Sequence, residues 1–317
     1  MVYCSEDQWP ASPPPYPEHK AGRADSAIEA YRVHQARMTW LDDDALPFVN
    51  VYAPTHVFAS AFGCELVATE GGGTWIKPLI TKPAEVAALK VPDLSHPVLA
   101  ALFYIAEEAR RRLGPDVLLK LPDIQSPMDI AAQIWEKTEF YYGIADAPEA
   151  VKELATKCRE LLTAFGNEWV RRFGPEFIAH YPDYYMPRGW TLSEDEIGTV
   201  SREMFKEFFE PHLTALAGHF GGLGIHCCAH ARHQWENLRT LPGLVALNLT
   251  QPPKVTADGY RFFARDCIHV HDNFPVDSGY LEWFDNEVPD ARIVVRPYVK
   301  TRREAVEIAS RMREWAG

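Results

Sequence analysis

Hydrophobic positions recur along this chain in two patterns, and one of them has the spacing of helices. The clearest case follows Asp146-Ala-Pro-Glu149, a capping box with proline inside the first turn. Apolar residues recur at three- and four-residue intervals from position 151 to 169, and Gly174 closes the run. This spacing predicts a long amphipathic helix. Thr301–Glu304 and Ser126–Asp129 begin two further helices in the same way.

The second pattern consists of short, mostly apolar runs of strand length between the helical segments. They are VLLKL (117–121), GIHCC (224–228), LVALNL (244–249), CIHVH (267–271) and RIVV (292–295). Such runs are typical of parallel strands covered on both faces. An eight-stranded barrel and an open doubly wound sheet both fit this order of strands and helices. Because the glycine-rich dinucleotide fingerprint is missing, we expect an α/β fold of the TIM-barrel type, (β/α)8.

The first 20 residues differ from the rest of the chain. They contain five prolines among Ser, Glu and Asp, a composition that disfavours a helix or a central strand. We therefore expect an extended or disordered arm over residues 1–20 and a single domain over 21–317.

Composition narrows the possible partners. The chain has 32 Lys and Arg against 44 Asp and Glu, a net charge of −12, which would repel nucleic acid. It lacks the roughly 20 consecutive apolar residues of a membrane helix and the order of a signal peptide, so we expect a cytoplasmic protein without a membrane partner. Small molecules and proteins are the expected partners. Six cysteines are too sparse for a disulfide framework at this length, which leaves metal binding or burial.

Histidine and cysteine gather in the second half of the chain, where seven of the twelve histidines lie between residues 212 and 271. Side chains alternate along a strand, so His226 and Cys228 lie on the same face of their strand. For the same reason Cys267, His269 and His271 lie on one face of theirs. If their strands are next-but-one neighbours in a barrel, these side chains share an interior layer. We therefore predict a zinc site made of His226, Cys228 and either Cys267 or His269. The alternative is that these residues are ordinary buried core.

Other polar residues follow predicted strands, where the mouth of a barrel would lie. Asp123 follows VLLKLP and is a candidate catalytic carboxylate, unless it is only a turn residue beside proline. Asn248 and Gln251 end the run LVALNLTQ, and Arg296 ends RIVVR, where a guanidinium can bind a substrate carboxylate. We interpret these three as candidate substrate-binding residues. The acidic stretch Glu194–Glu196 reads as the start of a helix and receives no catalytic role.

Several longer segments together resemble the uroporphyrinogen decarboxylase superfamily, which includes the methylcobamide:coenzyme M methyltransferases. The segments are AFGCEL (61–66), IQSPMDIAAQIW (124–135), APEAVKEL (147–154), LSEDEIGTVSREMFKEFFEPHL (192–213), GIHCCAH (224–230) and LPGLVALNLTQP (241–252). The resemblance spans most of residues 45–317 and implies a (β/α)8 barrel.

The methyltransferase branch implies zinc held by a His-x-Cys pair, which here is His226 and Cys228. Its third ligand is a cysteine near the last strand, whereas here no Cys or His follows His271. Either Cys267 or His269 replaces it, or no metal is bound. The resemblance favours zinc-dependent methyl transfer to a thiol from a methylated corrinoid on a partner protein. One alternative is cofactor-free decarboxylation of a polycarboxylate, in which Asp123 stabilises the positive charge that develops on the substrate. The other is a binding protein that has kept the barrel and lost catalysis.

Overall fold

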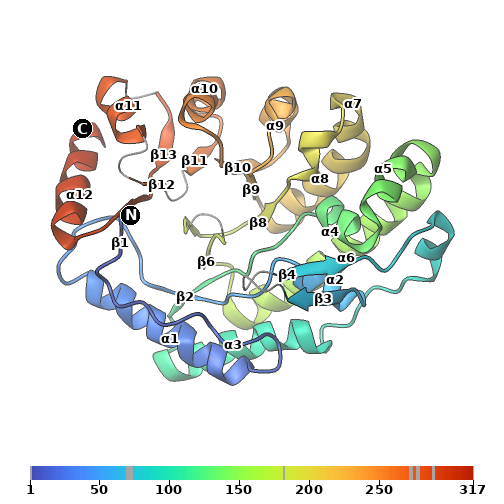
Figure 1. Ribbon diagram of the computed structural model, residues 1–317, viewed down its shortest axis with the longest axis horizontal. Coiled ribbons are helices and arrows are strands. Elements are labelled where there is room, and N and C mark those ends of the chain that lie inside the picture. Colours follow the sequence, from blue (N-terminus) through green and yellow to red (C-terminus); the bar gives the residue numbers. More distant parts are fainter. Residues whose placement is uncertain are drawn as a thin grey trace.

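The computed structural model describes residues 2–68, 74–180, 183–270, 274–275, 279–287 and 290–316. Most strands lie in the interior and helices surround them, from α11 and α10 at the top of Figure 1, past α12 at the left, to α1 and α3 at the bottom. Within the described part of the chain, no helix has both the length and the apolar character needed to cross a membrane.

The largest sheet is parallel throughout and has five strands in the order β13-β11-β10-β9-β8. These strands are β8 (Trp190–Ser193), β9 (Leu223–Cys227), β10 (Leu244–Leu249), β11 (Ile268–Val270) and β13 (Arg292–Val294). Four of the five predicted apolar runs form strands of this sheet. The expected strands and their parallel pairing are therefore confirmed here.

A second sheet has the order β2-β5-β6-β7. Its strands are β2 (Phe48–Asn50), β5 (Leu118–Lys120), β6 (Phe177–Ile178) and β7 (Tyr185–Met186). The first three are parallel and β7 runs back antiparallel to β6. A parallel bridge between Gln125 and Ser193 joins the chain beyond β5 to β8. The two sheets are thus connected along one side.

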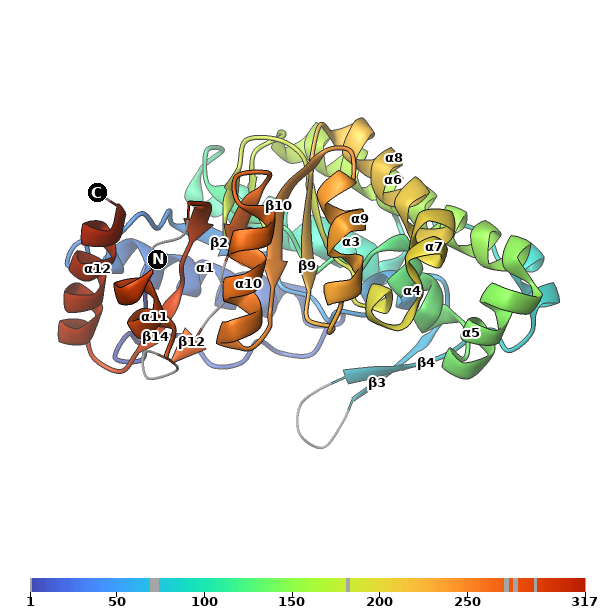
Figure 2. The same cartoon turned by 90° about the horizontal axis from the view of Figure 1, so that it is seen from above.

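The proline-rich start of the chain is extended and packed against the rest of the molecule. Its strand β1 (Tyr3–Cys4) pairs in parallel with β14 (Pro297–Val299), which also pairs with β12 (Phe274–Pro275). Val2 and Cys4 are buried. An antiparallel pair, β3 (Glu65–Ala68) and β4 (Thr74–Lys77), projects from one side of the molecule in Figure 2.

The strand pairings of the described residues give an α/β protein with parallel sheets, but they do not join all the strands into one closed ring. The expected class of fold is therefore shown, and closure of a complete eight-stranded barrel stays a prediction. The single domain over 21–317 also stays a prediction.

Helices follow most of the strands. They are α1 (Lys20–Arg37), α2 (Val57–Ala61), α3 (Pro97–Leu113), α4 (Pro127–Ile134), α5 (Lys137–Asp146), α6 (Pro148–Phe173), α7 (Arg202–Met204), α8 (Glu210–Phe220), α9 (Trp235–Thr240), α10 (Pro253–Phe263), α11 (Tyr280–Asn286) and α12 (Arg302–Ala316). Short 3-10 helices lie at η1 (Pro83–Ala88), η2 (Glu196–Thr199) and η4 (Arg232–Gln234), and a π-helical turn, η3 (Phe205–Phe209), joins α7 to α8.

Two of the three predicted helix starts have the expected N-terminal capping hydrogen bond. Ser126 accepts a hydrogen bond from the Asp129 amide at the start of α4, and Thr301 accepts one from the Glu304 amide at α12. The long helix α6 is also present. Its predicted cap is wrong, because Asp146 is the last residue of α5 and Ala147 precedes α6 without a capping hydrogen bond. Pro148 at the first helical position marks the start instead.

Register divides the residues of the large sheet into two rows. Ser193, His226 and Asn248 lie level on β8, β9 and β10. The neighbouring row contains Leu192, Ile225, Leu247 and His269. Since successive side chains point to opposite faces, the first row forms a polar inner face and the second packs outward under the helices. This division decides which predicted site residues can meet.

Candidate active site

The inner polar row continues one step beyond the strands, at their carboxyl ends. Two residues after Ser193 comes Asp195, and two residues after His226 comes Cys228. Ligand atoms of Asp195, His226 and Cys228 all lie within 4.8 Å of one another. We call these three residues the Asp-His-Cys triad. Two of the four predicted metal ligands, His226 and Cys228, are thus brought together.

Asn248 fixes the orientation and tautomer of His226. The Asn248 amide nitrogen donates to the carbonyl of Val270, so its oxygen faces His226 and accepts from the Nδ1–H of the ring. Nε2 then keeps its lone pair, as in histidines that bind a metal with one nitrogen and donate with the other. Burial lowers the pKa of His226 and so favours the neutral ring, and it outweighs the Asn248 hydrogen bond, which raises the pKa. Asn248 therefore holds the imidazole and is placed to act on His226 rather than on substrate.

Asp195 and Cys228 form a close acidic pair. Asp195 accepts hydrogen bonds from the Cys228 amide at 2.7 Å and from the Cys228 thiol at 3.0 Å. Burial, with the hydrogen bond and charge of Asp195, raises the pKa of Cys228 to about 12. No Lys or Arg forms an ion pair with Asp195 within the described ranges. A carboxylate and a potential thiolate without a basic partner suit a bound cation.

Beneath the triad lies a buried carboxyl pair, Asp129 on α4 and Glu194 at the end of β8. Asp129 accepts hydrogen bonds from the Asp195 and Glu196 amides at 3.0 Å and so anchors the turn that carries Asp195. Burial and the neighbouring acids raise the pKa of Asp129 to about 7. Burial and the charge of Asp129 raise the pKa of Glu194 well above its ordinary value. The pair therefore holds a proton at neutral pH.

Asp123 lies three residues beyond β5 and contacts the inner row of the large sheet at Ser193. Its carboxylate lies 3.2 Å from Nε2 of His180 and accepts from the Ser193 hydroxyl at 3.3 Å. Burial raises the pKa of Asp123, but hydrogen bonding and charge from His180 outweigh it, so the pKa lies below its usual value. Its side chain is 28% exposed, which leaves an ionised carboxylate accessible from the solvent.

The other two predicted ligands, Cys267 and His269, do not join the triad. His269 belongs to the outer row, and its ring packs against Tyr260 and Phe263 of α10. Cys267 precedes β11 and shares the outer direction of His269, about 10 Å below the level of Asn248 by strand rise. It is buried in the hydrophobic core. Alternation grouped these residues on one face correctly, but that face points toward the helices. His271, expected beside them, lies outside the described residues.

Two predicted substrate-binding residues are engaged with the protein itself. Gln251 donates to the carbonyls of Cys228 and Ala229 at 3.0 Å and so supports the loop after β9. Arg296 is buried and forms an ion pair with Asp183 at 3.0 Å. Asp183 also pairs with Lys120 at 2.5 Å. These contacts give both residues a structural role, so their predicted substrate contacts gain no support.

Two residues of the site were missed by sequence reasoning. Asp195 was assigned to a helix start, and it does precede η2, but its side chain points to Cys228 rather than capping the helix. Its position two residues after Ser193 carried the signal, since alternation puts both on one face. His180, which touches Asp123 and Ser193, follows a two-residue strand that has no detectable periodicity.

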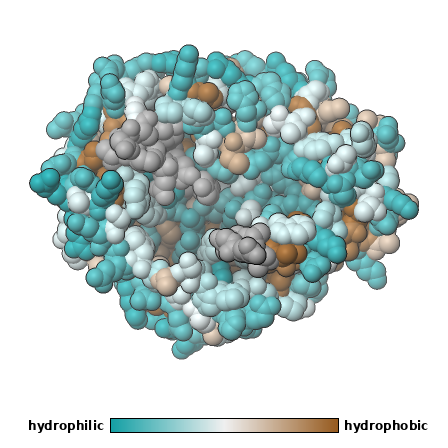
Figure 3. Space-filling model, in the orientation of Figure 1, coloured by the Kyte–Doolittle hydropathy of each residue, from teal (hydrophilic) through white to brown (hydrophobic). Residues whose placement is uncertain are grey.

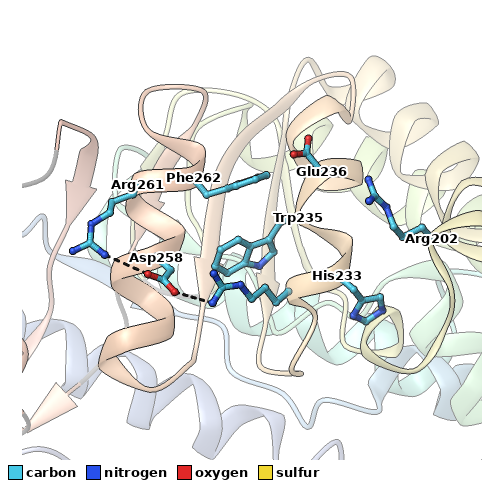
Figure 4. Close-up of a pocket in the computed structure, with 8 residues that line it drawn as sticks. Arg202, His233, Trp235, Glu236, Asp258, Arg261 and Phe262 are labelled. Atoms are coloured by element: carbon cyan, nitrogen blue, oxygen red, sulfur yellow. Dashed lines mark hydrogen bonds and ion pairs between the residues drawn. The ribbon is translucent and has the colours of Figure 1, made fainter.

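The surface is hollowed at two places, one on the face shown in Figure 3 and one on the outer side of the helices. The face seen in Figure 3 is largely hydrophilic and is hollowed near its centre. A separate cavity of about 480 Å³ lies on the outer side, between α9 and α10 (Figure 4). Asp258 pairs with two of the three arginines that line it, Arg232 at 2.7 Å and Arg261 at 3.3 Å. This outer cavity lies apart from the triad.

The polar residues of this site gather at the carboxyl ends of parallel strands. This arrangement is typical of α/β proteins whose active sites are formed by the segments that follow the strands. The chain belongs to the uroporphyrinogen decarboxylase (URO-D) family, whose model matches residues 48–258. Among solved structures, a methyltransferase from Methanosarcina mazei is similar, with a TM-score of 0.67, 16% identity, and coverage of 99% of this chain and 94% of that one. That likeness shows a shared fold. Curated protein sequences give no significant match.

Proposed function

We propose that the protein is a zinc-dependent methyltransferase in which Asp195, His226 and Cys228 hold the metal. The observation that carries this proposal is the convergence of a carboxylate, an imidazole and a thiol within 4.8 Å at the carboxyl ends of β8 and β9. Oxygen, nitrogen and sulfur donors of this kind suit zinc, and three protein ligands leave a position for substrate.

Residues around the triad hold two of its members in position. Asn248 presents Nε2 of His226, and Asp129 holds the turn of Asp195. Cys228 is exposed, so the triad is open to an incoming thiol. When bound, zinc would supply the positive charge that lowers the pKa of that thiol and makes it a thiolate nucleophile. The methyl donor in this proposal is a methylated corrinoid on a partner protein.

Metal analysis tests the site without relying on activity. We expect about one zinc per chain after dialysis, and a strong loss in Asp195→Ala, His226→Ala and Cys228→Ser. Cys267→Ser is the matched control, since Cys267 lies in the core and should leave zinc content unchanged. Zinc content that is low in the parent protein, or that survives all three triad substitutions, would remove the proposal.

A second measurement tests the reaction. Methylcobalamin with dithiothreitol is a simple donor and acceptor pair, in which the methyl group passes to a thiolate and cob(I)alamin leaves. We expect turnover that stops on chelation and returns with zinc. A zinc-loaded protein with no methyl transfer to any thiol tried would keep the metal site but refute the methyltransferase assignment.

Cofactor-free decarboxylation is the second candidate, and the ionised Asp123 beside His180 favours it. Such a carboxylate can stabilise positive charge that develops on a pyrrole. This candidate predicts decarboxylation of uroporphyrinogen that is insensitive to chelators and is lost in Asp123→Asn. Arg296 would not bind the substrate carboxylates, because Asp183 already holds it.

A further inference from the structure

A second pocket lies between the proline-rich arm and α1. Its volume is about 350 Å³, within the range of small-molecule sites. It is lined by the arm at residues 9–13 and by the small-residue face of α1 at Ser26, Ala27 and Ala30. Asn50, the last residue of β2, and Tyr52 also line it. The short side chains of α1 leave the space, and the prolines of the arm give it an apolar, rigid wall.

The single basic side chain that lines this pocket is Arg23, which is only 6% exposed. Its guanidinium donates to the carbonyl of Pro14 at 2.5 Å and to that of Tyr52 at 2.9 Å. It also lies over the rings of Tyr16 and Tyr52, at 5.1 Å and 5.4 Å from their centroids. These contacts fix the guanidinium in place but provide no negative charge.

Arg23 is therefore a buried cation without a carboxylate partner among the described residues. Its Nε–H also has no hydrogen-bond partner there. A buried charge that is neither paired nor fully hydrogen-bonded is costly, and burial accordingly lowers the pKa of this guanidinium. In the cavity between α9 and α10, by contrast, two of the three lining arginines, Arg232 and Arg261, share Asp258. The difference indicates that the counter-charge of Arg23 comes from outside the chain.

We propose that the pocket between the arm and α1 binds a small organic monocarboxylate, with its carboxylate at Arg23 and its apolar body against the arm and α1. One guanidinium matches one carboxylate in charge and in donor geometry. The apolar walls favour an acid with a hydrocarbon body over inorganic phosphate. This site is separate from the Asp-His-Cys triad, and the proposal does not depend on methyl transfer.

Calorimetric titration of the 317-residue protein with 3-phenylpropionate and with hexanoate tests this site. We expect saturable binding of at least one acid, and binding of its amide at least about 10-fold weaker because the charge is lost. Arg23→Met should weaken binding by a similar factor. Arg32→Met is the matched control, since Arg32 is an exposed arginine on the same helix, and it should bind as the parent does.

Ala30→Leu provides a test that leaves the arginine intact, because it fills the pocket from α1. It should reduce binding while the protein keeps its unfolding temperature and its circular dichroism spectrum. The proposal is overturned if neither acid binds the parent protein, if the amide binds as tightly as the acid, if folded Arg23→Met or Ala30→Leu binds like the parent, or if inorganic phosphate competes as effectively as the acids.

Discussion

At the scale of single residues, the hydrogen bond between Asn248 and His226 leads to a prediction about metal binding. Asn248→Leu removes the acceptor that fixes the His226 tautomer, so zinc affinity should fall about 10- to 100-fold. Competition with a chromophoric chelator measures this affinity. Asn286→Ala, at an exposed amide on α11, should not change it. Unchanged zinc affinity in a folded Asn248→Leu protein would mean that Asn248 does not set the tautomer.

His269 leads to a prediction about pH. Burial lowers its pKa to about 4, whereas an unfolded histidine titrates near 6.5. Between these values the unfolded chain binds more protons, so this group's contribution to stability is lost as pH falls from about 6.5 to 4. His269→Leu removes the effect. Its free energy of unfolding, relative to the parent, should rise by about 2 kcal/mol between pH 7 and pH 5.

Urea unfolding at the two pH values measures this difference. His230→Leu, at an exposed histidine, serves as the control and should follow the parent protein at both pH values. A parallel pH dependence of His269→Leu and the parent would show that His269 is not held neutral in the fold.

The same residues show how far sequence reasoning reached. The alternation of side chains can be read within a single strand, so the sequence correctly grouped His226 with Cys228 and Cys267 with His269. It does not say which of two faces is the inner one, because a short strand alternates in the same way whichever face it turns toward the centre. Register with β10 settled this point, and Asp195 entered the site only through a neighbouring strand.

At the scale of elements, α4 and the turn after β8 depend on each other through Asp129. Asp129→Ala leaves the Asp195 and Glu196 amides without their acceptor, so it should weaken zinc binding and cost about 1–3 kcal/mol of stability. Ser126→Ala removes the cap of α4 and a hydrogen bond to Glu194 but leaves the Asp129 carboxylate on the Asp195 turn, so it should cost about 1 kcal/mol and leave zinc affinity unchanged. Denaturant unfolding together with zinc titration separates the two variants. Equal zinc affinity in both would contradict a positioning role for Asp129.

Elements with strong local signals were predictable, and short ones were not. Capping by Ser126 and Thr301 follows from sequence, as do the apolar strands β9 and β10. The two residues of β6 are too few to show any period, and the antiparallel return of β7 has no local signature. His180 belongs to this connection, which explains why it was not predicted.

At the scale of the whole molecule, a buried ionic cluster joins distant parts of the chain. Asp183 pairs with Lys120 and Arg296 and accepts from the hydroxyl of Tyr3 in the arm. Burial alone would raise the pKa of Asp183, but Lys120 and Arg296 hold it well below its usual range. The resulting stability is present above pH 4 and is lost as pH falls further.

Asp183→Asn leaves two buried cations without a counter-charge, so it should cost about 3–5 kcal/mol at pH 7. Asp290→Asn breaks the exposed pair with Arg265 and should cost less than about 1 kcal/mol. Thermal and urea unfolding at pH 7 measure both. Similar small losses in the two variants would mean that the cluster contributes little to stability. Sequence alone could not reveal this cluster, because its members come from four separate segments.

The pairing of β1 with β14 has a consequence for synthesis of the protein on the ribosome. Residues 3–4 are translated before every other described strand, and their partners at 298–299 are translated after all of them. Strand β1 therefore stays without its partner until β14 has been translated, and a product that stalls before β14 would leave β1 unpaired. Because β14 is the last described strand along the chain, its pairings with β1 and β12 cannot form until the other described strands have been synthesised.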